Sequence, residues 1–182
     1  MYKNASASEN FADQNLNILA AYLSLEENYG NTFSIYTRAE TIDYEDDFPK
    51  TLPNLLLRRN GPSEDLPDYY MLDIIPGTQK NVLYKKIEMY IDHLESGDWQ
   101  EDEHPTILLV LDNSYIEDVA RKMFEERKDS RFIEDDEIFL MTTTRKAIVA
   151  AQTTNIWSTD MEHLLALWQP LKDDIIYYYV RT

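Results

Sequence analysis

The chain of 182 residues contains no cysteine, which excludes disulfides, thiol catalysis and thiolate metal sites. Glycine occurs only four times, and no glycine-rich loop is present that could cradle a phosphate group. No apolar run approaches the roughly 20 residues that a membrane-spanning helix needs. The polar start of the chain also lacks the apolar centre of a signal peptide. We therefore expect a cytoplasmic protein that has no membrane partner.

Basic residues are scarce as well: 17 lysines and arginines stand against 34 acidic residues, so the net charge is −17. A field of this sign repels phosphate backbones and disfavours broad, non-specific DNA binding unless a local basic patch exists. The acidic residues gather at 43–48, 98–104 and 134–137. Each stretch is typical of a solvated loop. The alternative is a negatively charged face that binds a basic protein or mimics nucleic acid.

The three histidines, His93, His104 and His163, show no metal-ligand spacing, and without cysteine no zinc site is expected. Ser114 is better explained as a helix cap, with Glu117 three residues later, than as a nucleophile.

The length suits one domain over residues 1–182, with a flexible tail at 1–7 and a C-terminal extension at 158–182. Apolar periodicity predicts strands and helices in alternation. We expect a helix at 8–29, strands at 33–37, 55–57 and 69–75, a helix through Leu94, a strand at 106–111, a helix from Ser114, a strand at 138–142, a helix at 144–152, a capped helix at 159–168 and a strand at 175–180. This order predicts an α/β protein whose mixed central sheet has helices on both faces. The early strands are antiparallel, and a right-handed parallel crossover joins the strands near 70 and 107.

Asp73 is the first residue that requires a functional explanation. It is the one carboxylate in the apolar run from Tyr69 to Ile75. A polar group in so apolar a strand has to be solvated, hydrogen-bonded or ligated. The helix that follows presents Leu83, Ile87 and Tyr90 on one face, and Lys86 is among its polar residues.

Three segments around Asp73 resemble the replication-relaxation family, which belongs to the PD-(D/E)XK nuclease-like superfamily and is found on plasmids and other mobile elements. Pro53-Asn54-Leu55-Leu56-Leu57 stands where the family has a Pro-Asp strand, and Leu72-Asp73-Ile74-Ile75-Pro76-Gly77-Thr78 where it has an acid followed by Gly-Thr. Lys86-Ile87-Glu88-Met89-Tyr90 matches its Lys-hydrophobic-x-x-Tyr helix, and Trp157 follows the core. The resemblance covers roughly residues 8–157. It implies a restriction-endonuclease-like core of αβββαβ order.

The resemblance also implies a magnesium-dependent nuclease site, from which this chain departs. Two carboxylates on neighbouring strands hold Mg²⁺, and a lysine two residues after the second acid supports the chemistry. Here Asn54 replaces the first acid, and Ile75 occupies the lysine position. We therefore interpret Asn54, Asp73 and Lys86 as the catalytic positions of a degenerate, inactive site. Asp73 is the one candidate metal ligand, and no cofactor is expected apart from Mg²⁺ if the site survives.

Several alternatives could complete the site. Pro67-Asp68 could be the true Pro-Asp, although its odd spacing from Asp73 points the two side chains to opposite faces of one strand. Lys86 could replace the missing lysine from the helix, or it could be an ordinary solvated lysine. Glu26 or Glu27 of the first helix could add a carboxylate.

The leading functional hypothesis is a catalytically degenerate nuclease-fold protein that serves as an accessory DNA- or protein-binding factor in plasmid or mobile-element replication or transfer. If the chain contacts DNA, the candidates are the basic residues around the central stretch, Arg58, Arg59, Lys80 and Lys85, which otherwise are ordinary surface charge. One alternative is an acidic module that binds a basic protein or a second copy of itself and has no nucleic-acid role. The other is an active magnesium-dependent nuclease with a migrated lysine.

Overall fold

The computed structural model describes residues 2–42, 48, 52–61, 68–75, 80–99, 104–134 and 140–149, with side chains from Phe11 onward. Several predicted features lie outside these residues: the helix at 159–168, the strand at 175–180, Trp157, His163 and Pro76-Gly77-Thr78. None of the helices in the described ranges is both long enough and apolar enough to span a membrane.

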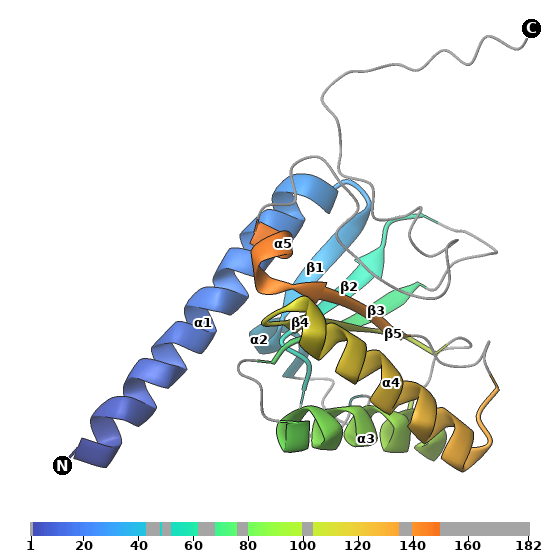
Figure 1. Ribbon diagram of the computed structural model, residues 1–182. Helices are drawn as coiled ribbons and strands as arrows, with labels where there is room; N and C mark the ends of the chain where they lie inside the picture. The colour runs from blue at the N-terminus through green and yellow to red at the C-terminus, as the bar shows by residue number, and fades with distance from the viewer. Residues whose placement is uncertain are drawn as a thin grey trace, which may run out of the picture.

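Helices and strands alternate through the described chain (Figure 1). In order they are α1 (Tyr2–Tyr29), β1 (Phe33–Thr37), α2 (Arg38–Thr41), β2 (Leu55–Arg59), β3 (Tyr69–Ile74), α3 (Lys80–Ser96), β4 (Thr106–Leu111), α4 (Ser114–Arg131), β5 (Leu140–Thr144) and α5 (Arg145–Val149).

The five strands form one mixed sheet in the order β1-β2-β3-β4-β5. β1 pairs antiparallel with β2, and β2 pairs antiparallel with β3. β3, β4 and β5 are parallel, joined through α3 and α4. The predictions of an α/β class, of antiparallel early strands and of a parallel crossover near residues 70 and 107 are confirmed.

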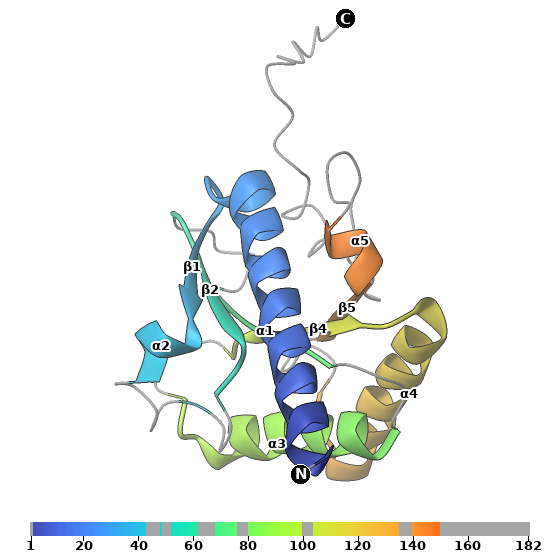
Figure 2. The same cartoon turned by 90° about the vertical axis from the view of Figure 1, so that its left-hand side faces the viewer.

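α1 and α5 lie on one side of the sheet and α3 and α4 on the other (Figures 1 and 2). The sheet therefore separates two hydrophobic cores. Met71 of β3 faces the core that contains the buried residues of α3 and α4, whereas Tyr70, Leu72 and Ile74 face the core that contains α1 and α5. Because side chains alternate along a strand, Asp73 shares the face of Met71 and lies beneath α3. This alternation determines which helix can supply partners to the buried carboxylate.

The structure differs from the prediction at the start of the chain and directly after β1. α1 begins at Tyr2, so residues 2–7, which were predicted as part of a tail, belong to the helix; Ala5 and Ala7 favour helix, and no glycine or proline interrupts the segment. The short helix α2 follows β1 directly, at a place where no helix was predicted. Glu40 stabilises its start, because its carboxylate accepts hydrogen bonds from the backbone N–H and the hydroxyl of Thr37, each at 2.7 Å.

Two boundaries near the end of the described chain also differ. The N-cap of α4 is Asn113, whose side-chain oxygen accepts a hydrogen bond from Ile116 N–H at 3.1 Å, so Ser114 is the first helical residue and not the cap. β5 ends at Thr144, two residues beyond the predicted Thr142, because its parallel pairing with β4 continues until Thr144 lies opposite Leu111.

Candidate functional site

Asp73 lies near the end of the central strand β3 and is 3% exposed. The Lys86 ammonium Nζ lies 2.7 Å from its Oδ2, and the Tyr90 hydroxyl donates a hydrogen bond to the same oxygen. The backbone N–H of Asn54 donates to Oδ1 at 3.2 Å. Both carboxylate oxygens therefore have protein partners, and three segments of the chain meet at this one group.

The two helical partners of Asp73 come from one face of α3. Lys86 and Tyr90 are four residues apart, so they lie one above the other on the helix surface. The Lys86 Nζ also lies 5.3 Å from the centroid of the Tyr90 ring, at cation–π distance. The Lys86 side chain is 16% exposed, so it is a largely buried partner of Asp73 and not the solvated lysine of the alternative interpretation.

Asn54 occupies the bend before β2 and joins that strand to the end of β3. Its side-chain oxygen accepts a hydrogen bond from the backbone N–H of Ile74 at 2.8 Å, while its own N–H donates to Asp73. Because Leu55 pairs with Leu72, Asn54 and Asp73 occupy the next opposed positions of the two strands. The Asn54 side chain thus holds the bend before β2 against the backbone at the end of β3.

The electrostatics of the cluster reflect a charge held in an apolar interior. Burial raises the pKa of Asp73 above its usual value, and the Lys86 charge with the hydrogen bonds from Lys86, Tyr90 and Asn54 acts against that rise. Burial, together with the adjacent Asp73 carboxylate, raises the pKa of Tyr90 well above 10. Tyr90 is therefore a neutral hydrogen-bond donor throughout the physiological pH range.

This donor set does not fit Mg²⁺. The ion prefers several oxygen ligands in octahedral geometry, usually with charged carboxylates among them. Here one carboxylate is paired with an ammonium, and the nearby amide oxygen already accepts a backbone hydrogen bond. Within the described ranges, no group of three or more histidine, aspartate or glutamate side chains is placed to hold a metal ion.

The carboxylates considered as replacements lie elsewhere. Asp68 precedes β3, is exposed, and bonds to the guanidinium of Arg59 at the opposite end of the strand from Asp73. Glu26 and Glu27 are exposed on the last turns of α1, at the end of the sheet where Phe33 pairs with Arg59. None of the three reaches the Asp73 cluster.

The predicted DNA-binding arginines differ from each other in accessibility. Arg58 is exposed, and its guanidinium carbon lies 5.8 Å from the centroid of the Tyr69 ring. Arg59 is buried and donates to the Gly61 carbonyl at 2.6 Å as well as to Asp68. Arg58 is thus the arginine of this pair that a partner can reach.

The predicted DNA-binding lysines are both exposed and belong to α3. Lys80 is its first residue, and the ammonium lies 5.9 Å from the centroid of the Tyr115 ring at the start of α4. Lys85 lies a little over one turn further along the helix. Since α3 follows the end of β3 and Arg58 pairs with the first residue of β3, Lys80 and Arg58 lie toward opposite ends of the sheet.

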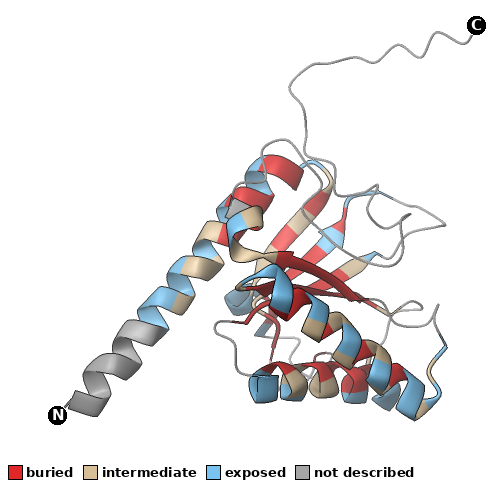
Figure 3. Cartoon of the chain, viewed as in Figure 1, coloured by how far each residue is buried: buried red, intermediate tan, exposed pale blue. Residues whose placement is uncertain are grey.

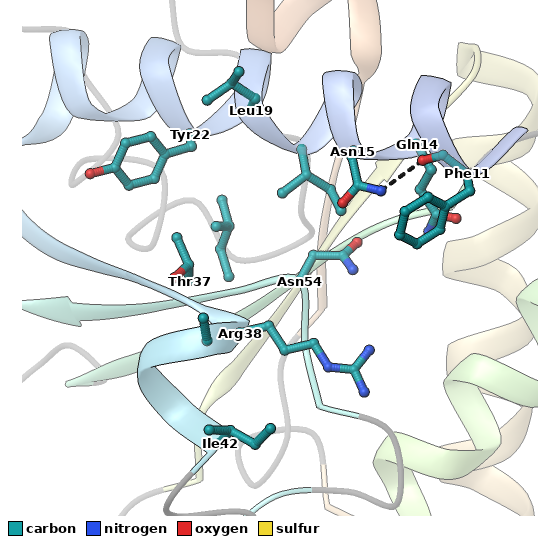
Figure 4. Close-up of a pocket in the computed structure, with 12 residues that line it drawn as sticks. Phe11, Gln14, Asn15, Leu19, Tyr22, Thr37, Arg38, Ile42 and Asn54 are labelled. Carbon is teal, nitrogen blue, oxygen red and sulfur yellow. Dashed lines mark hydrogen bonds between the residues drawn. The ribbon is translucent and has the colours of Figure 1, made fainter. Parts of the chain in front are cut away.

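A groove of about 770 Å³ opens beside Asn54, between α1 and the segment formed by α2 and the start of β2 (Figure 4). Its lining is mainly apolar, with amide groups and one cation, and comprises Phe11, Gln14, Asn15, Ile18, Leu19, Tyr22, Thr37, Arg38, Ala39, Ile42, Asn54 and Leu55. Asn54 is shared between this groove and the Asp73 cluster.

Sequence reasoning did not identify this groove. Phe11, Ile18 and Tyr22 recur at helical spacing within the helix predicted at 8–29, but this spacing does not indicate that the sheet leaves part of their face open. No role was predicted for Arg38, the cation of the groove.

Comparison with protein-family models, with curated proteins and with solved structures finds no match to this chain. Asn54 and Lys86, two of the three positions assigned to the degenerate site, both contact the third, Asp73. Tyr90 is the further member of the cluster, since its hydroxyl donates to Asp73. The Lys-hydrophobic-x-x-Tyr spacing includes this residue, but the sequence analysis assigned no role to its hydroxyl.

Proposed function

We propose that this chain is a catalytically degenerate relative of the PD-(D/E)XK nucleases, similar to the replication-relaxation family, and that it acts as an accessory binding factor in plasmid or mobile-element replication or transfer. The observation that supports the proposal is that both carboxylate oxygens of Asp73 already have protein partners. Its oxygens are occupied by Lys86, Tyr90 and Asn54, so an ion pair stands where a nuclease would hold its metal.

The positions of the residues support the nuclease origin. A nuclease of this class needs two carboxylates on neighbouring strands. Asn54 and Asp73 occupy opposed positions at adjoining strand ends, and a carboxylate in place of Asn54 would lie beside Asp73. The strand and helix order, and the lysine supplied by α3, are compatible with the proposed core.

A protein partner is favoured over duplex DNA. The net charge of −17 opposes a phosphate backbone, and the exposed cations Arg58 and Lys80 are separated along the sheet. The groove beside Asn54 is bordered by the exposed apolar residues Phe11, Leu19 and Ile42, which are typical of a contact surface. These exposed residues also favour the second candidate function, an acidic protein-interaction module with no nucleic-acid role.

Calorimetric titration with Mg²⁺ and Mn²⁺ tests the lost site. We expect no binding heat for the wild type, and binding by the Asn54→Asp variant, in which a second carboxylate faces Asp73. The double variant Asn54→Asp with Asp73→Ala should lose that binding, and circular dichroism would verify that each variant is folded. Metal binding by the wild type that disappears in Asp73→Ala would refute the degenerate site and favour the active nuclease, to be followed by a magnesium-dependent cleavage assay.

Binding to duplex DNA over a range of salt concentrations tests whether the chain contacts nucleic acid directly. If the chain binds DNA through α3, Lys80→Gln with Lys85→Gln should weaken the affinity and reduce the salt dependence. Lys122→Gln is the matched control, because Lys122 is an exposed helix lysine of α4. Absence of DNA binding at low salt would exclude direct DNA contact and leave a protein as the binding partner.

A further inference from the structure

The groove between α1 and the segment formed by α2 and the start of β2 collects exposed apolar side chains from separate parts of the chain. Phe11 and Leu19 of α1 are 70% and 52% exposed, and Ile42, directly after α2, is 52% exposed. Figure 3 shows that burial increases along α1 toward its C-terminal end, where Leu25 and Tyr29 pack into the core on this side of the sheet. The earlier turns of α1 therefore leave apolar surface open at the groove.

Two hydrogen-bond donors in the groove lack an acceptor within the described residues. Arg38 is exposed, and no described carboxylate pairs with its guanidinium. The side-chain oxygen of Asn54 accepts from the backbone N–H of Ile74, whereas its amide nitrogen has no acceptor in the described part of the chain. Figure 4 shows the Arg38 guanidinium and the Asn54 amide extending toward the same side of the groove. A ligand group that satisfies both donors must accept hydrogen bonds, and the guanidinium favours a group with negative charge.

We propose that the groove binds a small amphipathic monocarboxylate, with its elongated apolar body along α1 and its carboxylate on Arg38 and Asn54. The volume of about 770 Å³ lies within the range of roughly 300–1,000 Å³ that is typical of small-molecule sites. The lining runs along α1 from Phe11 to Tyr22, an interval of eleven residues that spans about 16 Å at 1.5 Å per helical residue. An extended chain of about twelve carbons, with bonds of about 1.5 Å, fits within this length.

The size of the groove favours a small molecule over a protein segment. Twelve described residues line it, whereas a stable protein interface uses about 20–30 residues on each side. The charge of the groove also differs from that of the whole molecule: the net charge of −17 attracts cations, but the charged side chain among the described lining residues is Arg38. A preference for an anion would therefore come from Arg38 itself. The inference goes beyond the proposed function and does not depend on the lost metal site.

Calorimetric titration of the full-length chain with dodecanoate, kept below its micelle concentration, tests the proposal. We expect one dodecanoate per chain, with a dissociation constant on the order of 10–100 µM. Arg38→Gln should weaken this binding by at least about tenfold, and Arg38→Lys, which keeps the charge but not the planar fork of donors, should weaken it less. Arg58→Gln is the matched control and should bind as the wild type does, because Arg58 is an exposed arginine outside the groove.

Dodecyltrimethylammonium has the same apolar chain with a positive charge, so it separates the effect of Arg38 from the field of the whole molecule. We expect the wild type to bind dodecanoate more tightly than this cation, and Arg38→Gln to reverse the order. Methyl NMR spectra locate the site. The signals of Ile18 and Leu19 should shift with dodecanoate, whereas that of Leu83, in the core on the other side of the sheet, should not.

Three results would overturn the proposal. Equal dodecanoate affinity of the wild type and Arg38→Gln, or tighter binding of the cation by the wild type, would mean that the groove does not select a carboxylate. Shifts confined to methyl groups outside the groove would place the binding elsewhere. Absence of dodecanoate binding would leave the groove to a protein partner. Circular dichroism would verify that each variant is folded, and the titrations contain no divalent cation, so their outcome is independent of the magnesium test.

Discussion

Replacement of Lys86 by methionine should destabilise the protein strongly, because it removes the cation from a buried ion pair. Methionine retains most of the volume of the lysine stem, so packing changes little. Asp73 would keep the hydrogen bonds from Tyr90 and Asn54 but would lose its counter-ion. Removing one partner of a buried ion pair costs about 3–5 kcal/mol of unfolding free energy. Because Tyr90 and Asn54 still donate to Asp73, we expect a loss of about 3 kcal/mol at pH 7.5.

Urea denaturation measures this loss directly. With a dependence of roughly 2 kcal/mol per molar urea, the unfolding midpoint should fall by about 1.5 M. The deficit should shrink as the pH is lowered, because the buried Asp73 accepts a proton more readily once Lys86 no longer opposes the effect of burial on its pKa. The double variant Lys86→Met with Asp73→Asn should recover most of the lost stability, since no unpaired charge remains.

Lys85→Met is the matched control for this experiment. Lys85 is the neighbouring lysine on α3 and is exposed, so its replacement should change the free energy of unfolding by less than about 0.5 kcal/mol. Equal, small effects of the two substitutions would refute the argument. Lys86 would then behave as a solvated lysine, and the buried ion pair would not contribute to the fold.

Three further predictions concern other hydrogen bonds and charges. Tyr90→Phe removes the hydroxyl that donates to Asp73 and should cost about 1.5–3 kcal/mol in urea denaturation. Burial raises the pKa of Glu117 above its ordinary 4.5, so the folded state binds its proton more tightly than the unfolded state does. Wild-type stability should therefore fall, relative to Glu117→Gln, as the pH rises from about 4.5 through the pKa of the folded state; thermal unfolding between pH 4 and 8 would reveal the opposite trend if this is wrong. Arg131→Gln removes a guanidinium that contacts three carboxylates of α3 and should cost about 1–2 kcal/mol, a loss that 1 M salt diminishes if the contacts are electrostatic.

The sequence was most informative where local pattern and burial agree. The uninterrupted apolar run from Thr106 to Leu111 gave the bounds of β4 correctly, because a central parallel strand is buried on both faces and therefore lacks polar residues. Asp73 was identified by the same reasoning, since a carboxylate within an apolar strand requires a partner.

The identity of that partner could not be derived from the sequence. Periodicity placed Lys86 among the polar residues of its helix, yet α3 lies over β3 so that Lys86 reaches the buried carboxylate. The position of Asn54 opposite Asp73 depends on the register in which β2 pairs with β3, and that register is a property of the tertiary fold. The groove likewise depends on how far α1 diverges from the sheet, a property of packing between distant segments.

The order of the strands in the sheet bears on how the chain assembles. Each strand pairs with the strand next to it in sequence, from β1 to β5, so no strand has to wait for a distant later segment. The Asp73 cluster follows the same rule: Asn54 precedes the aspartate by 19 residues, and Tyr90 follows it by 17. Short sequence separations reduce the loop-closure entropy that must be overcome before a contact forms, and they accelerate folding. During synthesis, the segment from β1 to α3 therefore contains all the partners of Asp73 before β4 has emerged. The parallel strands β4 and β5 can then pair with a strand whose buried carboxylate already has its counter-ion and hydrogen-bond donors.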